Sequence, residues 1–291
     1  MSSPSPIAPA PAGWHARLAL RFVRAGTRCI GHVQHEGPLR VLKTLYPEGD
    51  AIAHQVIVHP PGGIVGGDRL DVALSLEAGA HAVLTTPGAT RFYRSDGREA
   101  AQHVHAEIAD GARLEWLPLE TIAHSGCLAE NGATFALAAS AEMIGWDIVA
   151  LGLPAADDAF AAGRFMQHVE LAGVWLERGA IRGDDARLLR SPLGLAGHSA
   201  LLTMWFAAGR ALDGARADAL LDAAREVGAA PCSDDAGPPI AGVTCLQQRV
   251  VIVRALAHRV EPLLALARTV RARWRMRAWS LDDVRPRVWQ T

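Results

Sequence analysis

The sequence lacks the features that mark two large classes of binding protein. Its 29 Lys and Arg residues nearly balance 30 Asp and Glu residues, so the net charge is −1. General nucleic-acid binders and proteins of anionic membrane surfaces carry a basic excess instead. The apolar runs are also far shorter than the roughly 20 residues that a membrane-spanning helix needs. We therefore expect no nucleic acid and no membrane among the partners of this protein.

Cysteine is scarce, and the order of the cysteines is uninformative for metal binding. Cys29, Cys127, Cys232 and Cys245 form no C-x-x-C pair, which argues against a zinc knuckle or a thioredoxin-type site. Residues 1–13 are rich in Pro, Ala and Ser and lack the basic and apolar segments of a secretion signal. We expect these residues to form a disordered tail, and we expect a reduced, cytoplasmic protein.

What the sequence does contain is a large supply of apolar residues in strand-like patterns. Half of the 291 residues are hydrophobic, which is ample for a large core. Alternation predicts strands at residues 14–23, 27–33, 39–45, 55–58, 70–76, 169–175 and 198–206, and the stretch 242–256 predicts a strand pair or one long strand.

A weak internal repeat connects several of these segments. Residues 76–81 (L-E-A-G-A-H) are echoed by residues 108–113 (I-A-D-G-A-R), and strand-like sequence follows each copy. We predict further tight turns at Gly132 with Ala133 and at Gly179 with Ala180. Because no helix-length segment separates these units, the pattern favours layered β-sheets with partly solenoid-like strand–turn repeats over a parallel α/β fold.

Two helices are predicted in the C-terminal third. Asp213 is a candidate N-cap for a helix over residues 213–227. A second helix over residues 259–277 carries a basic stripe of Arg268, Arg271 and Arg275, which we interpret as a solvated face or, alternatively, a protein-binding surface. We expect a mainly β (α+β) domain over residues 14–291, β-rich over 14–206 and helix-containing over 207–291.

The densest candidate site is the loop at residues 59–68, H-P-P-G-G-I-V-G-G-D, which contains Gly62, Gly63, Gly66 and Gly67. Strand-like sequence lies on both sides of it. A phosphate-binding P-loop requires Gly-Lys-Ser/Thr at the start of a helix, and neither is present here. The remaining interpretations are a shaped loop between strands or a loop that presents Asp68 to a partner or an ion.

Other residues suggest chemistry only weakly. His103 and His105 lie at i and i+2 of a predicted strand, so their rings face the same way. They could bind a metal if a third ligand such as Asp68 joined them, although an exposed sheet face is the simpler interpretation. Ser125 and Cys127 lack a G-x-S-x-G elbow. Glu115 is interpreted as a strand-edge carboxylate.

Four stretches, taken in their order and spacing, resemble the urease accessory protein UreD (UreH) family. They are residues 59–68, residues 85–95 (T-T-P-G-A-T-R-F-Y-R-S), residues 114–122 (L-E-W-L-P-L-E-T-I) and residues 286–291 (P-R-V-W-Q-T). The resemblance extends from about Trp14 to the end of the chain. It implies a mainly β protein of unusual topology with two helices and no enzymatic activity.

The resemblance also implies a role and a set of partners. Members of this family act as chaperones in urease maturation. They bind apo-urease and the accessory protein UreF, which recruits the GTPase UreG. Nickel is thought to pass through an internal channel to urease, so Ni²⁺ would be transient cargo and no cofactor would be bound stably.

On this resemblance, Asp68 is the first candidate for a group on the nickel path and Glu120 is the second. Arg91, Tyr93 and Arg94 would shape the interior or a partner surface. The lack of a compact His/Cys cluster suits a conduit, because a site with several such ligands would retain the ion. We expect Asp68 and Glu120 to border an internal cavity.

Two alternatives remain open. One is a metal-dependent hydrolase that uses His103, His105 and Asp68, which would need three ligands converging on one metal position. The other is a purely structural adaptor without an ion path. The first is tested by the geometry of the three side chains, and the second by the content of the interior.

Overall fold

A computed structural model describes residues 13–153, 156–229 and 237–290. Within these residues, one sheet has seven strands in the order β15-β14-β11-β8-β5-β1-β2. Their bounds are β1 His15–Ala25, β2 Arg28–Glu36, β5 Arg69–Leu76, β8 Ala100–Ile108, β11 Leu128–Leu137, β14 Arg164–Leu171 and β15 Trp175–Arg182. We call this the first sheet. Residues 1–12 of the expected N-terminal tail lie outside the described ranges.

The second sheet follows the order β17-β18-β16-β12-β9-β6-β4-β3, and β7, β10 and β13 are attached beside this path. The bounds along the path are β3 Arg40–Val41, β4 Ala53–Val58, β6 His81–Thr85, β9 Arg113–Leu117, β12 Glu142–Leu153, β16 Ala200–Ala208, β17 Ile240–Leu246 and β18 Val250–Ala257. The attached strands are β7 Thr90–Phe92, β10 Thr121–Ala123 and β13 Asp158–Ala159.

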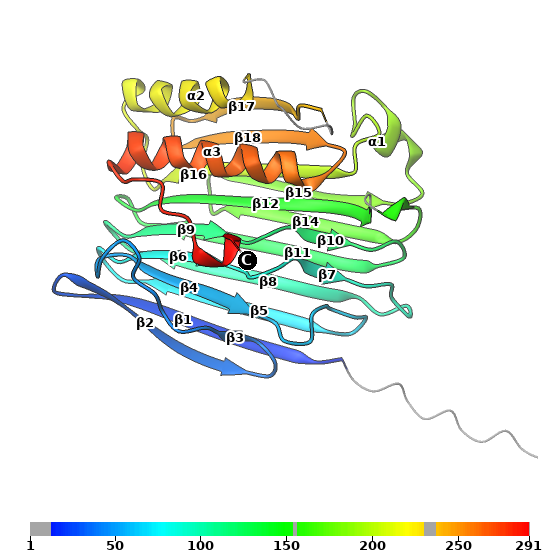
Figure 1. The fold of residues 1–291 in the computed structure, drawn as a ribbon, viewed down its shortest axis with the longest axis horizontal. Coiled ribbons are helices and arrows are strands. Elements are labelled where there is room, and N and C mark those ends of the chain that lie inside the picture. The colour runs from blue at the N-terminus through cyan, green and yellow to red at the C-terminus, as the bar shows by residue number, and fades with distance from the viewer. Residues whose placement is uncertain (1–12, 154–155, 230–236, 291) are drawn as a thin grey trace, which may run out of the picture.

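The middle of the chain winds as a short solenoid, as predicted. The pairs β5–β6, β8–β9 and β11–β12 each place one strand in the first sheet and the next in the second (Figure 1). Successive coils therefore add parallel neighbours, such as β5 beside β8 and β6 beside β9. This arrangement gives parallel strands without crossover helices, because the opposite sheet carries the return path.

Two of the predicted turns are wrong. Gly132 and Ala133 lie inside β11, and Gly179 and Ala180 lie inside β15. The third coil turns instead at Ala138, whose carbonyl accepts a hydrogen bond from the amide of Ala141 at 3.0 Å. Gly132 serves close packing: a Cβ there would lie 2.9 Å from Cδ2 of His103 on the neighbouring strand.

The two C-terminal helices were predicted correctly. They are α2 (Gly214–Gly228) and α3 (Val260–Trp279), and they cover the outer face of the second sheet (Figure 1). Asp213 caps α2, since its carboxylate accepts a hydrogen bond from the amide of Arg216 at 2.8 Å. A five-residue helix, α1 (Ala186–Arg190), and a terminal 3-10 turn, η2 (Arg287–Gln290), were not anticipated.

Three layers enclose two hydrophobic cores. One core lies between the sheets and includes Leu20, Leu84 and Trp205. The other lies between the second sheet and the helices and includes Trp146 and Trp274. The two faces of the second sheet are therefore both buried, and any polar side chain on it must find a partner within the protein.

The interpretation of the basic stripe on α3 is corrected by this packing. Arg271 and Arg275 are fully buried and point toward the second sheet rather than into solvent. Glu115, expected at a strand edge, is also fully buried, because β9 lies between β6 and β12. The two arginines lie on the same helix face as the apolar stripe. They are tolerated there because both pair with the buried carboxylate of Glu115 beneath the helix.

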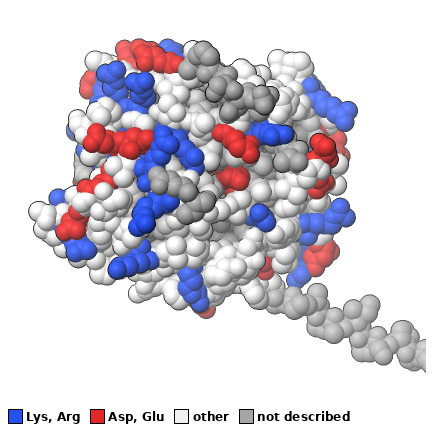
Figure 2. All heavy atoms as spheres, in the orientation of Figure 1, with Lys and Arg blue, Asp and Glu red and all other residues white. Residues whose placement is uncertain are grey.

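The face that carries the helices shows Lys and Arg interspersed with Asp and Glu (Figure 2), in keeping with a net charge of −1. Within the described residues, no helix combines the length and the hydrophobicity needed to cross a bilayer.

Candidate functional site

The four stretches singled out in the sequence are joined to one another by hydrogen bonds. Ile64 of the glycine loop donates its amide hydrogen to the carbonyl of Arg91 at 2.7 Å, and the amide of Tyr93 donates back to Ile64 at 3.0 Å. The amide of Thr90 donates to the carbonyl of Glu120 at 2.9 Å. The loop at 59–68, the stretch 85–95 and the stretch 114–122 thus form one continuous hydrogen-bonded unit.

The C-terminus joins the same unit through a single hydroxyl group. Trp289 donates its indole N–H to Oγ1 of Thr85 at 2.9 Å, and that hydroxyl donates to the carbonyl of Leu117 at 2.6 Å. The Trp289 ring also lies beside Trp146, with 5.5 Å between the ring centroids. Segments separated by about two hundred residues are therefore fixed to one another.

The glycine loop is shaped by close contacts. A Cβ on Gly63 would lie 2.1 Å from Cε2 of Tyr93, and one on Gly66 would lie 2.7 Å from Oδ1 of Asp96. Gly67 has φ +95°, a conformation that favours glycine. The loop can pack against the stretch 85–95 only because these positions lack side chains.

Asp68 fastens the loop to Trp14, the residue that precedes β1. Asp68 is 8% exposed, and its carboxylate accepts hydrogen bonds from the backbone amides of Trp14 at 2.8 Å and Val65 at 3.1 Å. A carboxylate with two backbone N–H donors is well solvated by the protein itself. The local geometry therefore gives Asp68 a role in positioning the loop.

Two adjoining cavities lie behind the loop, between the sheets. The larger, about 210 Å³, is lined in part by His59, Gly62 and Arg91. The smaller, about 40 Å³, lies deeper beside Asp147. Both are lined by Leu39, Ile57, Thr86, Thr90 and Gln102. The smaller cavity is large enough for water, which needs roughly 10–15 Å³.

Asp68 and Glu120 are not among the residues that line these two cavities. Each lies near the larger one, however. The charge of Asp68 acts on His59, whose pKa is lowered by burial and partly restored by that charge. Glu120 is bonded through its carbonyl to Thr90, which lines both cavities.

A row of polar side chains continues from the smaller cavity through the core between the sheets. On the first sheet, Gln102, Asn131 and Gln167 lie in register on three neighbouring strands. Gln102 donates to Asn131 at 3.1 Å. On the second sheet, Asp147 accepts from Gln167 at 2.8 Å and from Asn131 at 3.4 Å. Its carboxylate thereby joins the two sheets through amide groups.

The row then reaches the rim of the sheets. Thr203 lies in register beside Asp147, and Arg254 lies in register beside Thr203. The hydroxyl of Thr203 donates to Glu177 of β15 at 2.9 Å. No pattern in the sequence identified this set. We call it the polar row, and it consists of Gln102, Asn131, Gln167, Asp147, Thr203, Glu177 and Arg254. The available signal was a single Asp in the apolar stretch M-I-G-W-D-I-V-A-L.

Asp147 is the electrostatic centre of the row. It is 8% exposed, and burial raises the pKa of its carboxyl to about 6, with the negative charge of Glu177 adding to the shift. It accepts hydrogen bonds from the neutral amides of Asn131 and Gln167. A proton and a cation can therefore compete for this carboxyl near neutral pH.

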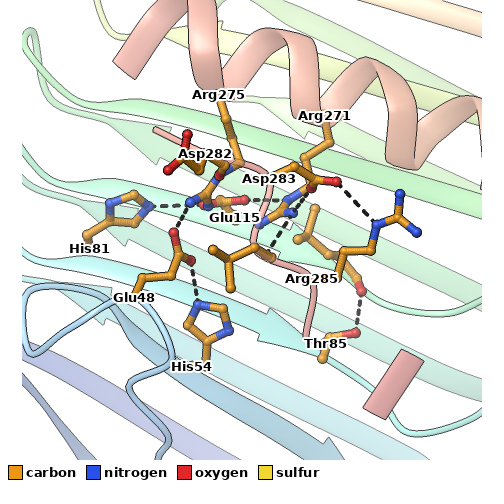
Figure 3. Close-up of polar contacts among 12 residues, drawn as sticks. Glu48, His54, His81, Thr85, Glu115, Arg271, Arg275, Asp282, Asp283 and Arg285 are labelled. Carbon is orange, nitrogen blue, oxygen red and sulfur yellow. Dashed lines mark hydrogen bonds and ion pairs between the residues drawn. The ribbon is translucent and has the colours of Figure 1, made fainter. Parts of the chain in front are cut away.

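A second buried cluster lies on the opposite side of the second sheet, beneath α3 (Figure 3). Arg271 donates through Nε to Glu115 at 2.6 Å, and Arg275 bonds both Glu115 and Glu48. His81 lies 3.1 Å from Glu115. Burial alone would raise the pKa of the Glu115 carboxyl, but Arg271, His81 and Arg275 hold it well below its usual range.

This cluster, which we call the charge clamp, fixes the C-terminal segment. Arg271 also donates to Asp283 and to the carbonyl of Val284, each at 3.2 Å, and Arg275 donates to the carbonyl of Asp282 at 3.0 Å (Figure 3). Every carboxylate here faces a fixed guanidinium group. The clamp is accordingly suited to holding the chain together and poorly suited to releasing an ion.

The remaining predicted residues lie elsewhere. Nδ1 of His103 lies 3.6 Å from Asp71 and Nε2 lies 3.4 Å from Glu130, on the outer face of the first sheet. His105 lies 3.8 Å from Glu107. Among the residues that the structure describes, no group of three or more His, Cys, Asp or Glu could hold a metal, so a hydrolase using His103, His105 and Asp68 has no metal centre there.

Tyr93 and Arg94 shape the outside of the loop end. The Tyr93 ring lies 4.9 Å from the His124 ring between centroids. The side chain of Arg94 packs over Gly126, where a Cβ would lie 3.1 Å from its Cγ. Of the predicted recognition residues, Arg91 faces the larger cavity, whereas these two build the surface around it.

Comparison with known proteins agrees with this assembly of four stretches. A family described as "UreD urease accessory protein" matches residues 15–290. Among similar proteins, the "Urease accessory protein UreD" of Polaromonas sp. (strain JS666) is 53% identical over 95% of this chain and 99% of its own length. That of Verminephrobacter eiseniae is 52% identical with the same coverage, and that of Methylibium petroleiphilum is 55% identical over 91% and 92%.

Proposed function

We propose that this chain, which belongs to the UreD urease accessory protein family, assists the insertion of nickel into apo-urease. It is an accessory protein rather than an enzyme. The family match covers both sheets and both long helices, so the assignment concerns the whole described fold.

The proposed setting is a cytoplasmic complex. In it, the chain bridges apo-urease and the accessory proteins UreF and UreG, and nickel is cargo rather than a resident cofactor. Support comes from the names of the relatives, each a urease accessory protein. A bridging role also suits a rigid body whose N- and C-terminal segments are fastened to one another by the charge clamp.

We further propose that Ni²⁺ crosses the protein along the two cavities and the polar row. The observation that supports this is Asp147: a buried carboxylate with neutral amide donors, next to a cavity that can hold water. Nickel accepts carboxylate and imidazole ligands, and a single carboxylate with water would bind it weakly. Weak binding allows release at the far end.

Asp68 and Glu120 stay candidates for the approach to this route. Asp68 acts on His59 at the larger cavity, and Glu120 is anchored to Thr90. Replacing Asp68 by Ala is expected to lower nickel delivery while the complex still assembles. Loss of assembly would assign Asp68 to the loop structure alone.

The central test is co-expression with the urease subunits and the other accessory proteins, scoring nickel per urease and urea hydrolysis. Omitting the chain should abolish activation, and unchanged activation would refute the accessory role. Asp147→Asn should keep the complex but lower the nickel content, whereas the exposed control Asp222→Asn should not. Normal nickel content in Asp147→Asn would favour the purely structural adaptor.

A further inference from the structure

The polar row ends in an ion pair that joins the two sheets at their rim. Arg254 of β18 donates through Nε at 2.8 Å and through Nη2 at 2.5 Å to the same oxygen, Oε2, of Glu177 on β15. The other oxygen of Glu177 accepts the hydroxyl of Thr203. Glu177 is thus shared between the interior row and a residue at the surface.

Arg254 occupies a position that alternation assigns to the core. Val250 and Ile252, on the same face of β18, are buried between the sheets. Arg254 follows them on that face, yet its side chain is 50% exposed and that of Glu177 is 25% exposed. Because β15 is the last strand of the first sheet (Figure 1), the pair spans the gap where the layer between the sheets meets solvent.

The chemistry of the pair differs from that of the charge clamp. Arg271 is fully buried and is also held by Asp283 and a backbone carbonyl, so it cannot leave its site cheaply. Arg254 is half exposed, and its hydrogen bonds from Nε and Nη2 both go to one carboxylate oxygen of Glu177. Exposed ion pairs are weak and open readily, because water solvates the freed guanidinium group.

We infer that Arg254 is a displaceable plug that closes this end of the polar row. This inference rests on the proposed conduit. The guanidinium group, a permanent cation, occupies the position beside Glu177 that a metal cation would take. While the pair is closed, it bars cations of the surrounding solution from Thr203 and Asp147. When Arg254 swings outward, Glu177 is free to receive a cation from the row and pass it on.

Access to the row can be measured without nickel or urease. For this test the full-length chain is prepared with the substitution Thr203→Cys, whose thiol keeps a weak donor toward Glu177. The substitutions Cys232→Ser and Cys245→Ser remove two other thiols that the reagent could label. Labelling with the small cationic reagent 2-aminoethyl methanethiosulfonate is followed at each cysteine by mass spectrometry. Cys29 and Cys127 are buried and report on the fold, because labelling there would reveal general opening.

Adding Arg254→Ala should accelerate labelling at position 203 by about tenfold or more, since modification of a buried thiol follows the population of the open form. Arg254→Lys keeps a cation at the rim and should label within about twofold of the parent. The control Arg225→Ala, on the exposed side of α2, should leave the rate unchanged. Cys127 should stay unlabelled throughout.

The outcomes separate the plug from the conduit. An unchanged rate in Arg254→Ala, or an equal increase in Arg254→Lys, overturns the plug even if Asp147→Asn lowers nickel delivery. Acceleration in Arg254→Ala alone supports the plug. If nickel delivery is then normal in both Arg254→Ala and Asp147→Asn, the row is an openable passage but does not carry the nickel.

Discussion

Glu115 and Asp147 are both buried carboxylates of the second sheet, but they lie on opposite faces of it. Glu115 faces α3 and meets the guanidinium groups of Arg271 and Arg275. Asp147 faces the first sheet and meets the amides of Gln167 and Asn131. The pKa of the first is held well below its usual range, whereas that of the second is raised to about 6.

The difference shows that burial does not by itself assign a role to a charged group. In the charge clamp each carboxylate faces a guanidinium group, so removing one ion leaves its partners buried without that counter-charge. In the polar row the carboxylate of Asp147 meets neutral amides and, among the described residues, forms no ion pair, so its charge depends on whether a proton or a cation reaches it. The clamp holds the fold, and the row is the part that can respond to a proton or a cation.

The largest expected effect comes from neutralising the clamp. Glu115→Gln leaves the buried Arg271 and Arg275 with Asp283 and Glu48 as their remaining carboxylate partners, so the free energy of unfolding should fall by about 3 kcal/mol or more. Chemical denaturation measures this. Glu107→Gln, at an exposed site, should change stability by less than about 0.5 kcal/mol. A loss below about 1 kcal/mol for Glu115→Gln would mean that the clamp is not a structural device.

The polar row predicts a pH dependence of the opposite sign to that of a salt-bridged carboxylate. The carboxyl of Asp147 titrates near 3.8 when unfolded and near pKa 6 when folded. Between these values the unfolded state ionises first, so this group lowers stability as pH rises from about 4 to 6, by roughly 2–3 kcal/mol. Above pH 6 to 7 the loss levels off.

Asp147→Asn tests this sign directly. The difference in the free energy of unfolding between Asp147→Asn and the parent chain should grow in favour of the variant as pH rises from 4 to 6. Subtracting the two curves removes the titration of all other groups. A difference that stays constant over this range would show that the carboxyl is not perturbed, and the comparison with Glu115 would fail.

An uncharged contact on the clamp side should have an intermediate effect. Thr85→Val removes the acceptor of the Trp289 indole and the donor to the Leu117 carbonyl, which should cost about 1–2 kcal/mol of stability. The difference between the tryptophan emission spectra of Thr85→Val and the parent chain should show a shift, because the environment of Trp289 changes as the C-terminal turn loosens. Thr244→Val, on exposed β17, is the matched control, and equal behaviour of the two would argue against this link.

The smallest effect is expected at the edge of the clamp. Asp283 is partly exposed and pairs with Arg271 and Arg285, each at 3.2 Å. Asp283→Asn should lower stability by only about 0.5–1 kcal/mol, because Arg271 keeps Glu115 and water screens the outer pair. Chemical denaturation at low and at high salt measures this: the difference in the free energy of unfolding between Asp283→Asn and the parent chain should be smaller at high salt. If Asp283→Asn lowered stability as much as Glu115→Gln does, the charge clamp would have no distinct centre and edge.

Part of the fold was predictable because it depends on patterns between residues that are close in the sequence. Alternation identified β1 and β5, the pair of similar segments at 76–81 and 108–113 identified the coils, and Asp213 identified the start of α2. The turn at Ala138 was missed because it contains no glycine at the expected place, and Gly132 misled because it serves packing against His103. The single-domain expectation for residues 14–291 stays a prediction.

The candidate site was predictable only in part. The ordered stretches 59–68, 85–95 and 114–122 identified the family, and the structure joins them through Ile64 and Thr90. Asp147 and Glu177 were not found, since Asp147 is a single Asp in an apolar stretch and Glu177 lies beside Arg178 in a strand of mixed composition. Their partners, Gln167 and Arg254, come from other coils, and no local pattern connects them.

The sequence by itself determined the layered β architecture, the two helices and the family, because these depend on periodicity, capping and ordered motifs. Tertiary structure alone decided which charges are buried together. The same arginine pattern on α3 suits solvent or a carboxylate, and only the position of β9 beneath the helix places Glu115 there. In the same way, only the facing of two sheets turns Asp147 and its distant amide partners into a row. Electrostatic roles depend on distances between strands, and those distances are fixed only when the coils stack.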